Sequence, residues 1–400
     1  MKLNKVFTLF KNLKRIKFSI SKKQIVIFDG VSFKDLKYII EVYDYFILED
    51  RLDRINTIYV TPSIIFYFFK YLFLVFRKYS IKVIYTIAII KSLKSKVVIT
   101  SIDNSINFFL CAKVLSKEIF FVAIQNGTRY EFEDLKYYIE AQALPIPQNY
   151  RKLFYIPNYI CFGQNEIDGV TKQNLKIEKF YKFGSIRMSN FFHYMKKKNI
   201  KLNKKLFDIC FISEPSINAN KRFKNKFVEE AAIEILKFTI KFAMENNSKF
   251  VFAPKRLGNK ETLLSELDFY KPYLNKKEGE FLTSNIIQKE NIYSSYLLMF
   301  QSSVVIGWQS TLLRDKFGLG EKILSCNFSK LEIKNFPVNG ICSLNNHNYE
   351  NFSARVKLIL NLENKDYFKQ IEQNPEYVMA FNREESVIEK TRNLIESNFL

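Results

Sequence analysis

The chain has 400 residues, of which 48% are hydrophobic and 16% aromatic, so it can bury more than one core and is not a disordered polypeptide. Lysine and arginine total 62 against 40 aspartates and glutamates, and the resulting net charge of +22 indicates an anionic partner. Nucleic acid, an acidic membrane surface and a phosphorylated substrate all fit this charge. The basic residues are spread along the chain without a zinc-ligand spacing or an arginine-rich motif, which argues against a dedicated nucleic-acid-binding protein.

The cysteines and the N-terminus indicate a cytoplasmic protein. The five cysteines are far apart and lie mostly inside apolar runs, which is typical of buried free thiols in a reducing compartment. The first 23 residues are basic and weakly amphipathic, and they offer no cleavage site of the secretory type.

The most membrane-like stretch is Ile64 to Phe76, which has 13 residues and contains Lys70. A helix that spans a bilayer needs about 20 apolar residues. The sequence therefore favours a buried or groove-lining helix. Peripheral attachment to the inner face of the cytoplasmic membrane, through this helix and the basic N-terminus, is the alternative.

Strands and helices alternate in the first half of the chain. Buried apolar runs predict strands, and stretches with apolar residues at helical spacing lie between them. The expected strands are Gln24–Phe28, Tyr45–Leu48, Thr57–Val60, Lys96–Ile102, Ile119–Ile124, Tyr159–Phe162 and Phe180–Phe183, and the longest expected helical region is 62–92. This order predicts an α/β unit with a mostly parallel sheet.

A polar, lysine-rich stretch at about 195–205 separates a second series of the same kind. Its expected strands are Phe207–Ile212, Lys249–Ala253, Val304–Ile306 and Lys322–Cys326, with helices at 226–245, 260–270 and 312–318. We therefore predict an α/β protein with two Rossmann-like domains facing across a cleft, residues 1–195 and 196–350. Residues 351–400 are expected to be helices that pack back on the first domain.

Polar residues follow the expected strands, and ligands of such sheets bind at the carboxyl ends of the strands. In the first half these residues are Asp29, Asp103, Asn104, the 125–129 segment and Glu166; in the second they are Ser213, Glu214, Lys255, Arg256 and 309–311. Lys255 and Arg256 follow a buried strand directly, so they either hold a phosphate or form a solvated surface pair. Each loop alone is unremarkable in polarity, and their convergence on one edge is what predicts a site.

Residues 303–325 read as a strand, a polar turn, an amphipathic helix and a second strand. Gln309, Ser310 and Thr311 precede the helix, where free backbone N–H groups and the positive end of the helix dipole favour an anion such as a phosphate. Asp315 lies about one turn after Thr311 and could accept a hydrogen bond from a ribose hydroxyl. A plain helix cap followed by a solvated acid is the alternative interpretation.

The order of the motifs resembles that of bacterial surface-carbohydrate biosynthesis proteins related to CDP-glycerol glycerophosphotransferases and Kdo transferases. The matching pieces lie at 97–104, 123–129, 161–166, 183–187, 208–213, 253–256 and 309–315. The resemblance implies a GT-B architecture, with a nucleotide-activated donor bound mainly by the C-terminal domain and a glycan or lipid-linked glycan acceptor on the N-terminal domain. A CMP- or CDP-linked donor is favoured. The implied donor residues are Ser213, Lys255, Arg256, Gln309, Ser310, Thr311 and Asp315, and the implied acceptor residues are Asn104, Gln125, Asn126, Arg129 and Glu166.

The chain departs from these relatives at two places. Where they carry Gln-His-Gly it has Gln125, Asn126 and Gly127, and an asparagine cannot act as a general base. The helix after Ser310 carries Asp315 in place of their glutamate, which shortens the reach to a ribose. The two histidines elsewhere in the chain, His193 and His347, lie in polar surroundings that suit a structural or surface role.

If a general base takes part, a carboxylate is expected; alternatively, Lys255, Arg256 and the helix N-terminus at 310–311 stabilise the leaving phosphate and the transfer needs little help from a base. Asp103 is the first candidate because it ends a buried strand, Asp29 is the second, and Glu131 or Glu133 is the third. An Asx turn or a helix cap is the alternative role for Asp103. The sequence has no Asp-x-Asp motif, so we expect no metal ion and no other cofactor in the transfer step.

These observations lead to one hypothesis with two alternatives. The hypothesis is a cytoplasmic glycosyltransferase that moves a sugar or a polyol phosphate from a nucleotide donor onto a surface polysaccharide such as capsule or lipopolysaccharide. The first alternative is a non-catalytic GT-B-like protein that binds anionic glycan or scaffolds its assembly. The second is a nucleotide-sugar epimerase of GT-B shape that acts on free donor.

Overall fold

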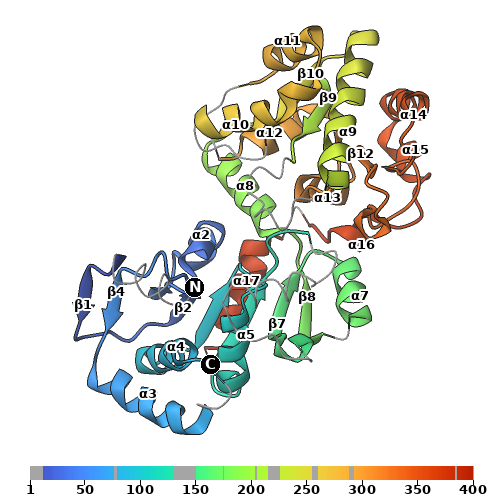
Figure 1. The fold of residues 1–400 in the computed structure, drawn as a ribbon. Coiled ribbons are helices and arrows are strands. Elements are labelled where there is room, and N and C mark those ends of the chain that lie inside the picture. Colours follow the sequence, from blue (N-terminus) through green and yellow to red (C-terminus); the bar gives the residue numbers. More distant parts are fainter. Residues whose placement is uncertain are drawn as a thin grey trace. The chain divides into compact units, whose positions relative to one another are not determined.

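The chain folds into two compact units, and each is built on a parallel sheet (Figure 1). Unit 1 comprises residues 1–162, 166–190 and 382–400, and unit 2 comprises residues 163–165 and 191–381. The structure is a computed structural model that describes residues 12–75, 79–128, 150–173, 175–202, 205–214, 226–254, 260–287, 292–382 and 385–399. The α/β class predicted from the alternating pattern is confirmed.

The sheet of unit 1 has six strands in the order β3-β2-β5-β6-β7-β8, and all neighbours are parallel. The strands are β2 (Ile25–Phe28), β3 (Tyr45–Leu48), β5 (Val97–Thr100), β6 (Phe120–Ile124), β7 (Tyr155–Cys161) and β8 (Lys176–Lys182). Strands β2, β5 and β7 are buried along their whole length and are mostly apolar, because helices cover both faces of the sheet. A separate two-stranded sheet pairs β1 (Arg15–Lys17) with β4 (Thr57–Tyr59).

Successive strand residues of unit 1 face two different cores, as the alternation of side chains along a strand requires. Val26 and Phe28 lie in a core with α3, α4 and α5, whereas Ile25 and Ile27 lie in a core with α2 and α17. The helices of unit 1 are α2 (Phe33–Ile40), α3 (Pro62–Val75), α4 (Ile81–Leu93), α5 (Ile106–Leu115), α7 (Gln164–Lys172) and α17 (Val387–Glu396), with the 3-10 helices Gly30–Ser32 and Tyr150–Leu153. The boundary between the units crosses α7 and α8 (Ile186–Lys197).

The region 62–92, expected as one helical stretch, is two helices. The side chain of Ser80 accepts a hydrogen bond from the backbone N–H of Val83 and so caps the start of α4. Both helices are apolar, and the break between them is marked in the sequence by the charged residues Arg77 and Lys78 and by the capping Ser80.

The sheet of unit 2 has five parallel strands in the order β10-β9-β11-β12-β13. The strands are β9 (Phe207–Ile212), β10 (Phe250–Ala253), β11 (Ser302–Gly307), β12 (Ile323–Cys326) and β13 (Ser343–Leu344). The helices are α9 (Lys226–Glu245), α10 (Lys260–Tyr270), α11 (Lys276–Ser284), α12 (Ser294–Phe300), α13 (Thr311–Gly318), α14 (Tyr349–Asn361), α15 (Asn364–Phe368) and α16 (Pro375–Val378), with the 3-10 helices Lys271–Tyr273 and Glu332–Lys334.

The C-terminal helices are divided between the units. Helices α14, α15 and α16 belong to unit 2, and only α17 belongs to unit 1, where Val387, Ile388 and Ile395 are buried in the core beside α2. Among the described residues, no helix combines the length and the apolar character needed to cross a bilayer.

Candidate functional site

The order of the strands in unit 2 defines one place where a ligand is expected. Strand β9 is flanked by β10, which follows it in sequence, and by β11, which lies on its other side. The connections leave β9 and β11 in opposite directions, and parallel sheets bind ligands outside the carboxyl ends of their strands at such a switch point. Here the switch point is formed by Ser213 and Glu214 after β9 and by residues 308–310 after β11.

The turn after β11 presents the start of α13 at this switch point. Ser310 is the N-cap, and its side chain accepts a hydrogen bond from the backbone N–H of Leu312 at 3.3 Å. The N–H of Gln309 donates to Oε2 of Glu214 at 2.8 Å, which ties the two strand ends together. Gln309, Ser310 and Thr311 are partly exposed, so the first turn of the helix can be reached by a ligand. Beside them, the buried indole N–H of Trp308 has no acceptor among the described residues.

Two residues predicted to bind the donor have buried side chains. Ser213 donates from its hydroxyl to Oε2 of Glu266 at 2.9 Å, inside unit 2. Asp315 is fully buried, and its Oδ2 accepts from the hydroxyl of Tyr296 at 2.8 Å. These contacts bind strands and helices of unit 2 to one another, so the described structure offers neither side chain to a ribose or a phosphate.

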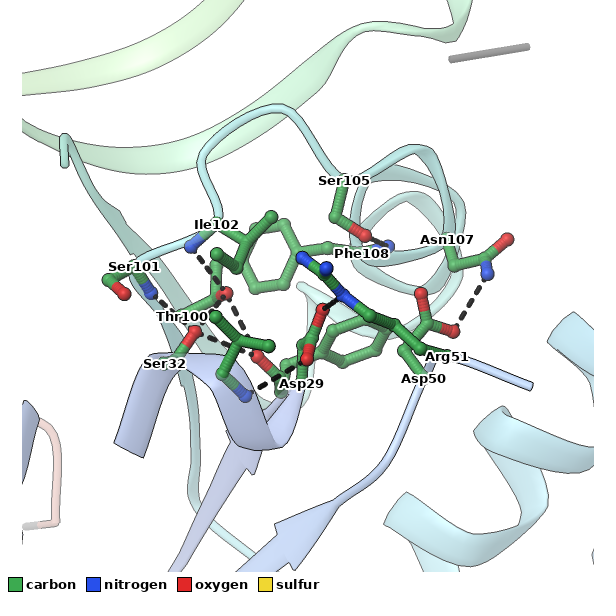
Figure 2. A network of polar contacts seen from close by, with 12 residues as sticks. Asp29, Ser32, Asp50, Arg51, Thr100, Ser101, Ile102, Ser105, Asn107 and Phe108 are labelled. Carbon is green, nitrogen blue, oxygen red and sulfur yellow. Dashed lines mark hydrogen bonds and ion pairs between the residues drawn. The ribbon is translucent and has the colours of Figure 1, made fainter. Parts of the chain in front are cut away.

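Unit 1 has a corresponding switch point. Strand β2 lies between β3, which follows it in sequence, and β5, so the ends of β2 and β5 flank the position where the direction of the connections changes. Asp29 follows β2, and Thr100 and Ser101 close β5. Figure 2 shows the polar contacts that link these ends: Ser32 Oγ lies 3.1 Å from Thr100 Oγ1 and accepts from the N–H of Ser101 at 3.0 Å.

Asp29 is the most constrained residue of this network. Its φ of 68° is a conformation that L-residues rarely adopt, and such strain is often found at functional sites. Its carboxylate accepts from the N–H of Val31 at 3.0 Å and forms an ion pair with Arg51, whose Nε lies 2.9 Å from Oδ2 (Figure 2). Asp29 is 4% exposed at its side chain and Arg51 is 45% exposed, so the cation is the part that a ligand meets first.

The residues after β3 complete the site, and the sequence interpretation missed them. Asp50 accepts from Asn107 Nδ2 at 2.7 Å and pairs with Lys82 at 2.9 Å. Burial, and next the negative charge of Asp29, raise the pKa of Glu49 above its ordinary value. Its Oε2 is buried without a hydrogen-bond partner among the described residues. The available signal was the triplet Glu49, Asp50 and Arg51 directly behind an apolar run that was itself recognised as a strand.

The other candidates of unit 1 are mostly buried. Asp103, the first choice for a base, is fully buried and accepts from the hydroxyl of Tyr159 at 2.8 Å. Gln125 is fully buried as well. Its Nε2 donates to the carbonyl of Gly127, and its Oε1 accepts from the backbone N–H of Phe162. Glu166 is also buried.

Of the remaining candidates, Asn104 and Asn126 are partly exposed. Arg129, Glu131, Lys255 and Arg256 lie outside the described residues. His347 stacks on Phe238 and lies 3.5 Å from Glu234, as expected for a surface role. Within the described ranges, no group of histidines, cysteines and carboxylates has the arrangement of a metal site.

Comparison with known proteins identifies the fold. No protein-family model and no curated protein sequence matches the chain. Among solved structures, UDP-GlcNAc 2-epimerase from Methanocaldococcus jannaschii in complex with UDP-GlcNAc and UDP matches with a TM-score of 0.52 at 12% identity, over 96% of this chain and 99% of that chain. A variant of the Wall Teichoic Acid Polymerase TagF with CDPG matches with a TM-score of 0.50 at 11% identity, over 99% of this chain and 92% of that chain.

The chain has the GT-B fold. The match extends over nearly the whole length of both proteins, so it includes both sheets and agrees with two Rossmann-like domains. At this level of identity the likeness defines the fold alone. In a GT-B fold the two switch points described above, one in each unit, are the places where ligands are expected.

Proposed function

We propose that the chain is a nucleotide-dependent transferase that moves a sugar, or a polyol phosphate, onto a surface polysaccharide or a lipid-linked glycan. The observation that carries this proposal is the partly exposed start of α13 at the switch point of unit 2. A net charge of +22 suits a protein whose donor and acceptor are both anionic. Two solved structures of the same fold contain UDP with UDP-GlcNAc, or CDPG, which supports a nucleotide-linked donor.

Unit 2 binds the donor in this proposal. The phosphates face the first backbone N–H groups of α13, where the helix dipole stabilises the negative charge that grows on the leaving phosphate. The indole N–H of Trp308 gains an acceptor in the same step. Lys255 and Arg256, which follow β10 in the sequence, add positive charge. Because Asp315 is buried, Glu214 instead accepts the hydrogen bonds of the sugar hydroxyls. A CMP- or CDP-linked donor remains the favoured class.

Unit 1 binds and activates the acceptor. The acceptor hydroxyl attacks the sugar carbon or the phosphorus of the donor, a new bond to the acceptor oxygen forms, and the bond to the nucleotide phosphate breaks. The proton of that hydroxyl passes to a carboxylate. We assign this role to Glu49 with Asp29, because a raised pKa lets Glu49 take up a proton closer to neutral pH. Asp103 instead orients the network through Tyr159.

The proposed compartment is the cytoplasm. The five cysteines are free and buried, as suits a reducing environment, and nucleotide-activated donors are available there. Burial raises the pKa of Cys161 and of Cys210 to about 12, so these thiols are unreactive in the folded chain.

The deciding experiment measures nucleotide release from a panel of CMP-, CDP-, UDP-, GDP- and dTDP-linked donors, with and without a membrane extract that supplies lipid-linked glycans. A transferase releases nucleotide from one donor only when the extract is present, and Glu49→Gln abolishes the release. Conversion of the free donor to its epimer without extract would establish the epimerase alternative. Donor binding without any turnover would favour a non-catalytic protein.

A further inference from the structure

Helix α3 (Pro62–Val75) has an apolar face that packs inside unit 1. Ile64 and Tyr71 are buried, and Tyr67, Phe68, Leu72 and Val75 are partly buried against the core around α4 and α5. These positions follow the spacing of a single helix face. In Figure 1, α3 lies at the periphery of unit 1, next to α4.

The opposite face of α3 is also apolar, and it is exposed. Its large side chains are Phe73 at 86%, Leu74 at 65%, Phe66 at 63%, Phe69 at 52% and Ile65 at 45% exposure. A helix that is apolar all round is normally buried on all sides, in a large core or in a membrane. A contiguous apolar patch of this kind on a folded protein marks an interaction surface, whereas isolated exposed apolar residues do not.

The sequence segment that contains this face has charges of one sign, although two of its lysines pair with acids elsewhere in unit 1, Lys82 with Asp50 and Lys91 with Glu118. From Thr57 to Lys96 the sequence contains no aspartate or glutamate, and its charged residues are Lys70, Arg77, Lys78, Lys82, Lys91, Lys94 and Lys96. Lys70 is exposed within the apolar face itself, where a long side chain can extend its ammonium group away from apolar surroundings.

A second exposed segment of unit 1 has the same character. Strand β1 pairs with β4, and the chain continues from β4 into α3 after two residues. Ile16 and Phe18, in and beside β1, are 55% and 73% exposed, and the neighbouring Lys14, Arg15 and Lys17 are exposed as well. Strand β1 and helix α3 therefore both combine exposed apolar side chains with exposed basic residues.

We propose that the outward face of α3, formed by Ile65, Phe66, Phe69, Phe73 and Leu74, inserts into the surface of an anionic lipid bilayer. A helix of 14 residues is about 21 Å long, too short to cross a bilayer, so it lies in the plane of the interface. The exposed basic residues Lys14, Arg15, Lys17 and Lys70 match anionic headgroups, whereas a protein partner would need an acidic rim to do the same. This inference rests on exposure and charge and does not depend on the transferase activity.

The test is co-sedimentation of the full chain with vesicles of phosphatidylcholine alone and of equal parts phosphatidylcholine and phosphatidylglycerol. We expect the wild type to bind the mixed vesicles, and added salt to weaken the binding. The double variant Phe69→Ser/Phe73→Ser should partition at least about tenfold less, because it removes two inserting aromatic side chains. The matched control is Tyr273→Ser/Ile292→Ser, which removes two exposed apolar residues of unit 2 and should bind like the wild type.

Three outcomes would overturn the proposal. Wild-type protein that binds neither vesicle excludes a lipid surface. Wild-type binding by Phe69→Ser/Phe73→Ser, with loss in Lys70→Glu, would make the attraction purely electrostatic and leave the apolar face without a role. A dimer in solution that only Phe69→Ser/Phe73→Ser dissociates would show that a second copy of the chain covers this face.

Discussion

Ser310→Ala separates a nucleotide site at α13 from a helix cap of purely structural value. The substitution removes the hydrogen bond that the Ser310 side chain accepts from Leu312 N at 3.3 Å. Loss of an N-cap serine costs about 1 kcal/mol of stability. For a unit of this size that loss lowers Tm by about 2–4 °C in the absence of ligand.

The assay is thermal unfolding with and without the nucleotide that stabilises the wild type most. A ligand at about 100 times Kd adds roughly 2.7 kcal/mol, and a tenfold weaker Kd reduces that gain to roughly 1.4 kcal/mol. If the hydroxyl also helps to hold the phosphate, Ser310→Ala should therefore lose about half of the ligand-induced stabilisation in addition to the cap.

Ser386→Ala is the matched control. Ser386 caps α17 in unit 1, where its side chain accepts from the N–H of Glu389 at 3.2 Å, so its loss should cost a similar amount without ligand. It should leave the nucleotide-induced gain unchanged. Equal ligand-induced gains in Ser310→Ala and the wild type would refute our assignment of this residue to the donor site, and equal losses in both variants would show that the assay reports stability alone.

Four further predictions concern the chemistry and the stability of the chain. Asp29→Asn should lower kcat at least about 100-fold while costing about 1 kcal/mol, whereas Arg51→Met, which breaks the same ion pair but keeps the carboxylate, should retain most turnover; equal losses would make the pair structural. Folding raises the pKa of Glu49, so above about pH 4.5 the folded chain binds more protons than the unfolded chain, and the free energy of unfolding falls as pH rises through the folded-state pKa. Glu49→Gln should therefore be more stable than the wild type at about pH 7 but not at about pH 4, as measured by denaturant titration. Lys316→Met should cost about 3 kcal/mol in thermal unfolding, because the buried Lys316 ammonium donates to two carbonyls and pairs with a carboxylate, whereas the exposed Lys357→Met should be neutral. The five buried thiols should stay unreactive toward a disulfide reagent in native protein and react on unfolding, and rapid labelling of any of them in folded protein would contradict their burial.

The elements could be predicted where the sequence carries both a hydrophobic pattern and a boundary. Strand Phe207–Ile212 and helices 226–245 and 260–270 have the bounds expected from the sequence, because apolar runs and turn residues coincide there. Between residues 271 and 301 the expectation contained no element, yet α11 and α12 are present. Both helices are short, and helices of this length are stabilised by tertiary packing rather than by the helix propensity of their own residues.

The sequence predicted where the candidate site lies, but it predicted less well which side chains face a ligand there. The polar residues after each apolar run mark the strand ends, since a buried strand must end where its backbone meets polar surroundings. Whether such a residue faces a ligand depends on what packs against it. Ser213 and Asp315 meet Glu266 and Tyr296, which are 53 and 19 residues away in sequence, and no local pattern shows that contact.

The sequence by itself determined the α/β class, the strand ends as the place for ligands and the basic character of the chain, because hydrophobic periodicity and charge are local properties. Only the tertiary structure decided the strand orders that create the two switch points and the ion pair of Asp29 with Arg51. It also decided that α17 alone of the described C-terminal helices belongs to unit 1 and that the second apolar face of α3 stays exposed. These features arise from contacts between distant parts of the chain, whose free energies are set by packing and burial that no single segment encodes.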